Sequence, residues 1–399
     1  MTSPPKTAPV TFAPLRGVRV LDLSRYLPGP FLTRILSDLG AEVVKVEPIR
    51  GEGMRWMPPH VDGIGATFGG LQAGKDSVAV DLKKPEGVAF VRALAAASDV
   101  LVEGFRPGKL DALGLGPASL MEENPRLIVC SLTGYGQTGP LANRAGHDLN
   151  YIARSGLLGL SGPADGPPLV PPIQAADVGG GTFPGAIAVL AALIERDQTG
   201  RGRHLDIALA RGSVAFAATA YASHRAGFVE RRGAGMLTGG APCYRCYRTA
   251  DDRYVAVGAL EPNFFGTLVT LAGRPELAAS MYAQGDDGVA AQRELEALFA
   301  TRTAAEWMEL VDGHDVCLEI VRTPDEAMAA PEHAEVVQTV GGHTVVSVHL
   351  GAPVEPVTRP PSQLGADAPA VTERLGLPAD LVSSAVSAGA IVWPQEGTS

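Results

Sequence analysis

The stretch VRVLDLS (residues 18–24) decides the fold class of this chain. It is a short run of aliphatic and β-branched residues bounded by glycine and proline, which is typical of a buried strand. Residues 30–39 follow as a predicted helix with proline in its first turn, and AEVVKVE (41–47) predicts a second strand. Strand, helix and strand in such close succession form a βαβ unit, which implies parallel pairing.

The same alternation continues beyond this unit. Residues 85–97 predict a helix, and residues 100–103 and 127–132 predict two further strands. An apolar helix is predicted over 182–196, and residues 205–225 are expected to continue helically. These elements predict an α/β fold with a large open parallel-sheet, Rossmann-like domain.

A second, smaller domain is indicated after a basic, glycine-rich crossing at residues 226–242. Two strands at 244–249 and 254–259, followed by helices, predict an α+β unit. The large domain is therefore expected over residues 1–225, completed by 331–399. The small domain with its linkers is expected over 226–330.

A Rossmann-like fold can bind a dinucleotide. Glu47 ends the second predicted strand, where an acid could hold a ribose hydroxyl. The preceding turn, SRYLPGP (24–30), lacks the G-x-G-x-x-G glycines that let the backbone approach a pyrophosphate. We therefore reject an NAD-binding interpretation.

Charge is unevenly distributed along the 399 residues. The net charge of −10 disfavours nucleic acid as a partner, yet residues 1–110 carry a balance of +3 and the remainder −13. One interpretation is that charged residues are distributed over the surface by chance. The other is that an anionic ligand docks on the N-terminal part. The candidate cations are Arg25, Arg34, Arg50, Arg55, Lys83, Arg106 and Lys109.

Composition also indicates the compartment. No apolar run approaches the ~20 residues that span a bilayer, and no apolar segment follows a basic cluster near the N-terminus, so we expect neither a membrane span nor a secretory signal. Four cysteines predict a reducing cytoplasm. Cys243 and Cys246 form a C-x-x-C without a second pair or a histidine cluster, so no metal is expected.

Three residues stand out chemically. His147 lies in GHDLNY (146–151), Asp177 directly precedes three glycines and the apolar helix, and Glu261 follows a predicted strand. Taken singly, they could be a surface histidine, a helix N-cap and a helix-start acid. Taken together, one imidazole and two carboxylates in apolar, glycine-rich settings suit proton transfer to and from carbon.

Ordered motifs along the chain carry a resemblance to a known family. They are LRGVRVL (15–21), LGAEVVKVE (39–47), EGFRPG (103–108), GYGQTGP (134–140), GHDLNY (146–151), DVGGG (177–181), GGAP (239–242) and VGALEP (257–262). The chain resembles the family III CoA-transferase superfamily, and within it most closely the α-methylacyl-CoA racemases. The resemblance extends from about residue 14 to past residue 322.

The resemblance implies one of two chemistries. In the racemases, the histidine and the aspartate flank the α-carbon of a 2-methylacyl thioester and exchange its proton through an enolate. In the transferases, the same aspartate attacks the thioester to form a mixed anhydride. The presence of His147, Asp177 and Glu261 together favours the racemase, with Glu261 orienting His147. A non-catalytic acyl-CoA-binding protein is a third, less favoured alternative.

The resemblance also implies where CoA binds, as part of the substrate and with no other cofactor. The family pattern assigns its contacts to Val80, Asp81, Leu82, Lys83, Gly104, Phe105, Arg106, Gly146, Asp148, Asn150 and Tyr151. One departure is that Lys109 and Ala112 stand where the racemases carry an arginine. The loop at 48–55 is transferase-like, with Arg50 and Arg55 as candidate phosphate ligands.

Family members are interlocked homodimers with an active site between the large domain of one subunit and the small domain of the other. The resemblance leaves open which subunit supplies Glu261. Met236, Leu237 and Tyr244 are expected to face an apolar acyl group, whose identity stays open.

Overall fold

The computed structural model describes residues 11–228 and 231–394, which form two compact units. Among the described residues, the first unit comprises 11–152, 174–215 and 331–394, and the second comprises 153–173 and 216–330. The predicted division had assigned 153–173 and 216–225 to the large domain. The structure instead groups both segments with the second unit.

The first unit is built on a six-stranded sheet in the order β5-β2-β1-β6-β7-β8, and every pairing is parallel. The strands are β1 (Arg19–Asp22), β2 (Glu42–Pro48), β5 (Asp76–Val80), β6 (Val100–Glu103), β7 (Ile128–Thr133) and β8 (His204–Ala208). This confirms the predicted α/β class. The chain builds outward from β1 in one direction and then resumes at β6 on the other side, so the topological switch point lies between β1 and β6.

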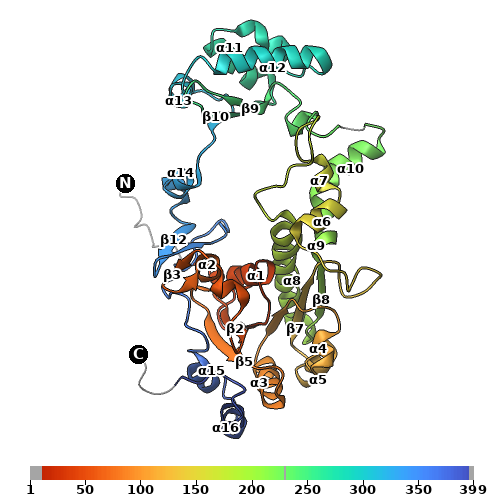
Figure 1. Cartoon of the computed structure of the whole chain (residues 1–399), viewed down its shortest axis with the longest axis vertical. Coiled ribbons are helices and arrows are strands. Elements are labelled where there is room, and N and C mark those ends of the chain that lie inside the picture. The colour runs from red at the N-terminus through yellow and green to blue at the C-terminus, as the bar shows by residue number, and fades with distance from the viewer. Residues whose placement is uncertain (1–10, 229–230, 395–399) are drawn as a thin grey trace, which may run out of the picture. The chain divides into compact units, whose positions relative to one another are not determined.

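Helices cover both faces of this sheet (Figure 1). α1 packs against α8, and α3 packs against α5 and α16. The helices of the first unit are α1 (Pro28–Asp38), α2 (Ala66–Gln72), α3 (Pro85–Ala96), α4 (Lys109–Ala112), α5 (Pro117–Glu123), η2 (Ala175–Thr182), α8 (Phe183–Thr199), α9 (Leu209–Gly212), α15 (Ala368–Arg374) and α16 (Ala379–Ser387). Two short hairpins, β3 (His60–Val61) with β4 (Ile64–Gly65) and β12 (Val337–Val340) with β13 (His343–Val346), complete the unit.

The alternation of side chains along the strands gives the two sheet faces different characters. Leu21 of β1 and Val44 and Val46 of β2 belong to an apolar core shared with α3. Their neighbours Asp22 and Lys45 are also buried, and must project from the opposite face because successive strand residues alternate. One face of the β1–β2 pair is thus apolar, and the other holds buried charges.

The second unit contains an antiparallel sheet in the order β11-β10-β9. Its strands are β9 (Tyr244–Arg248), β10 (Tyr254–Gly258) and β11 (Leu318–Ile320), and its longer helices are α10 (Ala218–Arg225), α11 (Pro262–Leu271), α12 (Gly285–Phe299) and α13 (Ala304–Val311). Tyr247 stacks on Phe299 in its core with ring centroids 4.8 Å apart, and Trp307 packs against Phe299 at 4.7 Å with its ring tilted by 49°. This confirms the predicted α+β character. α6 (Asp148–Arg154) begins in the first unit and ends in the second.

Two predictions for the large domain were wrong. Residues 205–208 were predicted to be helical, but they belong to the edge strand β8 (His204–Ala208). In this strand, His204 and Asp206 are exposed, whereas Leu205 and Ile207 are partly buried. That alternation is a strand pattern, and small residues after it misled the assignment. β5, the opposite edge strand, was not predicted.

The apolar helix predicted at 182–196 is present as α8. Together with η2 it forms a stretch, Ala175–Thr199, that is long and apolar enough to cross a membrane by length and composition alone. α8 packs against α1, β7 and β8, which makes it a helix of the layer covering the sheet. One side of it stays open, since Ile187 and Ile194 are 67% and 63% exposed.

Candidate active site

Two cavities border the loops that follow β1 and β6, at the carboxyl ends of the parallel strands. Arg25 and Phe105 line both cavities. In open α/β sheets, ligands bind at this edge where the strand order reverses. The sheet topology and the cavities therefore indicate the same ligand-binding site, at the switch point between β1 and β6.

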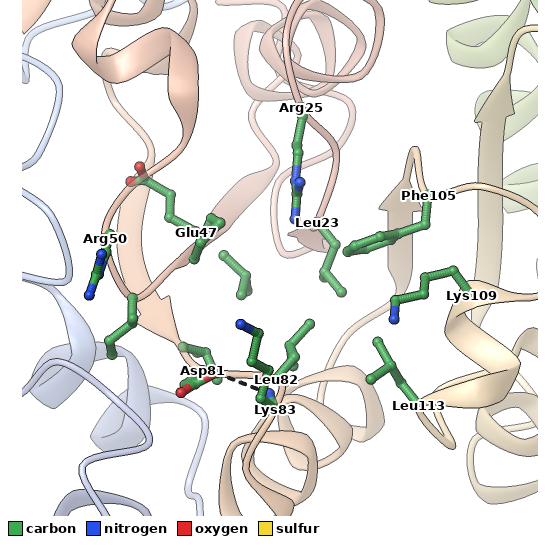
Figure 2. Close-up of a pocket in the computed structure, with 14 residues that line it drawn as sticks. Leu23, Arg25, Glu47, Arg50, Asp81, Leu82, Lys83, Phe105, Lys109 and Leu113 are labelled. Atoms are coloured by element: carbon green, nitrogen blue, oxygen red, sulfur yellow. Dashed lines mark hydrogen bonds between the residues drawn. The ribbon is translucent and has the colours of Figure 1, made fainter. Parts of the chain in front are cut away.

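The first cavity has a volume of about 600 Å³ and is apolar with cationic margins (Figure 2). Arg50 and Lys109 enter it from opposite sides, and Lys83 lies between them. It is lined by Leu23, Arg25, Val46, Glu47, Pro48, Ile49, Arg50, Val80, Asp81, Leu82, Lys83, Phe105, Lys109 and Leu113. Seven of the predicted CoA-binding residues thus line one cavity. They include Lys109, at which this chain departs from the arginine of the racemases.

Arg55, a predicted phosphate ligand, and Arg34, a candidate cation for an anionic ligand, have other roles. Arg55 is buried, donates from Nε to Glu47 Oε2 at 2.8 Å and stacks over the ring of Phe68 at 4.4 Å. Arg34 is buried against Asp38 and donates to the carbonyl of Ala73. Neither arginine lines either of these two cavities, so both assignments are corrected to internal ion pairs.

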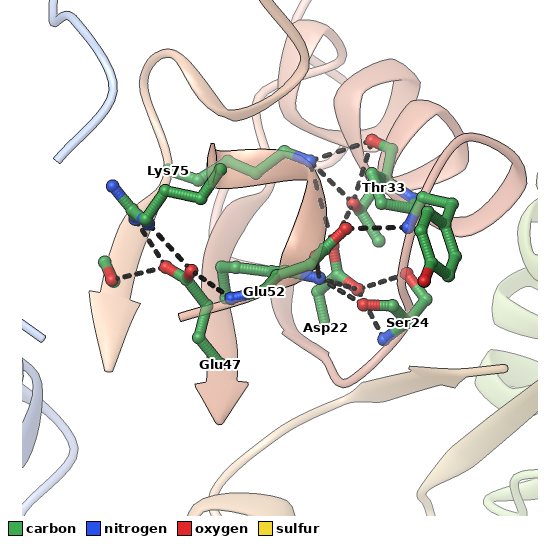
Figure 3. Close-up of polar contacts among 11 residues, drawn as sticks. Asp22, Ser24, Thr33, Glu47, Glu52 and Lys75 are labelled. Atoms are coloured by element: carbon green, nitrogen blue, oxygen red, sulfur yellow. Dashed lines mark hydrogen bonds and ion pairs between the residues drawn. The ribbon is translucent and has the colours of Figure 1, made fainter. Parts of the chain in front are cut away.

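A buried charged network holds the loop between β1 and α1 (Figure 3). Lys45 Nζ lies 3.1 Å from Glu52 Oε2 and 3.6 Å from Asp22 Oδ1, and Lys75 Nζ donates to Thr33 Oγ1 at 2.8 Å. Glu52 also accepts the N–H of Tyr26 at 2.7 Å. Burial lowers the pKa of Lys75 to about 7, against the opposing attraction of Asp22.

That loop forms one wall of the second cavity, which has a volume of about 650 Å³. Tyr26 is held there with a positive φ of 60°, uncommon for a residue with a side chain. The predicted site residues that line it are Gly104, Phe105, Arg106, Gly146, His147, Asn150, Tyr151 and Asp177. Arg25, a candidate cation of the sequence, also lines it. Tyr26 and Arg144 line it as well and were not predicted, although Tyr26 lies in the loop that follows the strand at the switch point.

His147 lies in the turn that begins α6. Its N–H donates to Asn150 Oδ1 at 3.0 Å, and its carbonyl accepts the N–H of Asn150 at 2.8 Å. Tyr151 donates its hydroxyl to the carbonyl of Gly146 and packs edge-on against Tyr135, with centroids 5.2 Å apart. The turn is therefore fixed from within, while the imidazole itself is exposed at the cavity.

Asp177 projects from η2, a π-helical turn that leads into α8. Burial, and then the negative charge of Asp148, raise the pKa of its carboxyl to about 7. A methyl group added at Gly180 would meet the backbone of Leu209 and Ser213, and one added at Gly212 would meet the backbone of Gly180. The turn bearing Asp177 thus packs main chain against main chain.

The remaining predicted site residues lie elsewhere. Asp148 lines neither cavity, because its carboxylate accepts the N–H groups of Ala176 and Asp177. Glu261 belongs to the second unit, is exposed and directly precedes Pro262 at the start of α11. Within the described ranges, no three His, Cys, Asp or Glu side chains gather to hold a metal.

Comparisons with known proteins agree with this arrangement. The chain is 37% identical to "Alpha-methylacyl-CoA racemase" of Mus musculus over 79% of each chain, and 38% identical to "Succinyl-CoA:glutarate CoA-transferase" of the same organism over 79% of this chain and 73% of the relative. The crystal structure of a CaiB/BaiF family protein from Brucella suis superimposes with a TM-score of 0.79 and 32% identity, covering 92% of this chain and all of that one. The model of CoA-transferase family III matches residues 15–374, so the chain belongs to this family of enzymes acting on CoA thioesters.

Proposed function

We propose that this enzyme inverts the α-carbon of 2-methylacyl-CoA thioesters by 1,1-proton transfer through an enolate. The observation that supports the proposal is that His147 and Asp177 line one cavity, and that the pKa of Asp177 is raised to about 7. A carboxyl group with this pKa exchanges protons in both directions near neutral pH.

In the proposed mechanism, His147 and Asp177 work on opposite faces of the substrate. One removes the α-proton, and the other delivers a proton to the far face, which inverts the centre. A well-placed N–H donor to the enolate oxygen would contribute about 3–4 kcal/mol. The order of the two transfers depends on which enantiomer is bound.

The first cavity suits the nucleotide end of CoA in this proposal. Arg50, Lys83 and Lys109 would contact its phosphates, and Leu82 and Phe105 offer apolar surface to the adenine. The guanidinium of Arg25 lies over the ring of Phe105 at 5.2 Å, at the border of the two cavities. The pantetheine arm would pass this pair to bring the thioester to His147.

We further propose a cytoplasmic, interlocked homodimer. The exposed apolar side of α8, with Phe183, Ile187 and Ile194, supports burial of this helix against a second copy. Glu261 would then orient His147, supplied by either chain.

The alternative is a CoA transferase that acts through a mixed anhydride on Asp177. It is favoured by the near-equal identity to a racemase and to a succinyl-CoA:glutarate CoA-transferase. Both reactions use the same CoA site and the same aspartate, so the fate of the α-proton separates them.

Deuterium wash-in tests the proposal. A 2-methylacyl-CoA is incubated with the enzyme in D₂O, and we expect α-deuteration with loss of optical purity, abolished in His147→Ala and Asp177→Asn. His60→Ala, an exposed histidine outside both cavities, serves as the control. Absence of exchange together with CoA transfer to a free carboxylate, and trapping of an Asp177 acyl group by hydroxylamine, would establish the transferase instead. Thioester binding without either reaction would indicate a non-catalytic binding protein.

A further inference from the structure

Asp148 joins two segments of the second cavity that lie far apart in sequence. It is the first residue of α6, directly after His147. Its Oδ1 accepts the N–H of Ala176 at 2.7 Å and the N–H of Asp177 at 2.9 Å, both in the first turn of η2. One carboxylate oxygen therefore connects the turn of His147 to the turn of Asp177.

These two N–H groups are donors that the helical turn leaves without internal partners. A charged acceptor is the strongest partner that protein chemistry offers such donors. The other end of η2 is held differently, by the main-chain contacts of Gly180 with Leu209 and Ser213. The position of Asp177 thus depends on Asp148 at one end of the turn and on backbone packing at the other.

Asp148 also places a second negative charge next to Asp177. The charged and titratable groups that line the same cavity are Arg25, Tyr26, Arg106, Arg144, His147 and Tyr151. The negative charge of Asp177 itself contributes to raising the pKa of Tyr151 to about 12, after burial.

We infer that Asp148 is a positioning residue of the active site, which sets both the place of the Asp177 carboxyl group and its readiness to hold a proton. The inference rests on the proposed function, since a two-way proton carrier needs both properties. It assigns to Asp148 a contact with the protein main chain in place of the substrate contact that the family pattern implied.

Two substitutions separate the two roles. Asp148→Asn keeps an acceptor oxygen for the two N–H groups and removes the charge. Asp148→Ala removes both. Asp197→Asn, at an exposed carboxylate of α8 that pairs with Arg126, is the matched control.

The direct measurement is the titration of Asp177 by carbon NMR in protein labelled with [¹³Cγ]aspartate, with the signal assigned by its loss in Asp177→Asn. We expect the midpoint to lie about one pH unit lower in Asp148→Asn than in the parent and in Asp197→Asn, because a neighbouring negative charge has been removed. An unchanged midpoint would overturn the electrostatic role. This measurement does not depend on the reaction, so it stands even if the racemase proposal fails.

The kinetic measurement tests the positioning role. We expect the acid limb of the pH profile for α-proton exchange to move down with the NMR midpoint in Asp148→Asn, with KM retained. In Asp148→Ala, we expect kcat to fall by about 100-fold, the size of effect that small displacements of catalytic groups produce. Equal kcat in Asp148→Ala and the parent would overturn this role, and thermal unfolding of each variant verifies that it is folded.

Discussion

At the scale of single residues, the environment of each acid decides its role more than its residue type does. Asp148 and Asp177 lie within one hydrogen bond of each other, yet one binds main-chain N–H groups and the other faces a cavity. Burial and a like charge raise the pKa of Asp177 to about 7 from an ordinary value of 3.8. That shift has a consequence for folding as well as for chemistry.

The first prediction concerns the stability of Asp177→Asn. A carboxyl group whose pKa is higher in the folded state binds its proton more tightly there, so folding is disfavoured progressively as the pH rises from about 4 to about 7. The amide carries no such penalty. We expect the variant to be more stable than the parent at pH 8, by at most about 4 kcal/mol, and equal to it near pH 4.

Urea unfolding at the two pH values measures this difference. A variant that is less stable than the parent at pH 8 would show that the carboxylate of Asp177 is stabilised where it lies, contrary to the raised pKa.

At the scale of elements, the loop after β2 holds two arginines with opposite surroundings. Arg50 is exposed at the first cavity, and Arg55, in the same loop, is buried against Glu47. Both fit the expectation of a cationic loop. Sequence spacing alone could not tell which one faces a ligand, because the distinction depends on Phe68, which lies against Arg55, and on Ser77 of β5, which donates to Glu47.

The second prediction contrasts these two arginines. Arg55→Met leaves Glu47 buried without its counter-ion, so we expect a loss of about 3–5 kcal/mol of unfolding free energy. Arg50→Ala should leave stability unchanged and raise KM for the CoA thioester about tenfold, as expected for one lost charge-assisted contact. Thermal unfolding and steady-state kinetics on both variants measure the contrast, which would be refuted if Arg50→Ala proved the more destabilising change.

Elements whose formation depends on local sequence were predicted well, whereas features that depend on contacts between distant segments were not. β1, α1 and β2 were predicted correctly, because strong apolar runs are bounded by glycine and proline. β8 was mistaken for a helix, since its alternation is short and small residues follow it. The pairing of His147 with Asp177 in one cavity followed from family resemblance, whereas the bond from Asp148 to the Asp177 N–H depends on a fold contact between segments about thirty residues apart.

At the scale of the whole molecule, the proposed homodimer predicts complementation between defective chains. If Glu261 of one chain serves His147 of the other, co-expression of His147→Ala with Glu261→Gln should yield heterodimers with one intact site. We expect activity from differentially tagged, co-purified heterodimers. The two variants mixed after separate purification should stay inactive, because interlocked chains do not exchange.

Inactive heterodimers would mean that each site takes both residues from one chain. The same preparation with His147→Ala on both chains gives the background rate, and a parent chain paired with His147→Ala gives the rate expected for one site.

The open side of α8 carries a further prediction for the assembly. Ile187→Asp places a charge in the middle of the apolar side of this helix, which is 67% exposed at that residue within the single chain. We expect it to prevent the dimer from forming, because a buried unpaired charge is costly. Light scattering after gel filtration measures the mass, and Val346→Asp, at a half-exposed position of β13, should leave it unchanged. A dimeric Ile187→Asp protein would exclude this side of α8 from the interface.

The close approach of Gly180 to the backbone of Leu209 and Gly212 bears on how this enzyme could be re-engineered. Since main chain meets main chain there, the location of the Asp177 carboxyl group, proposed to react, should depend little on the side chains that line the cavity around it. Randomising Tyr26 and Ala145 on the cavity wall would therefore vary substrate preference while Asp177 keeps its position. The glycines themselves are the two positions that a mutant library should leave untouched.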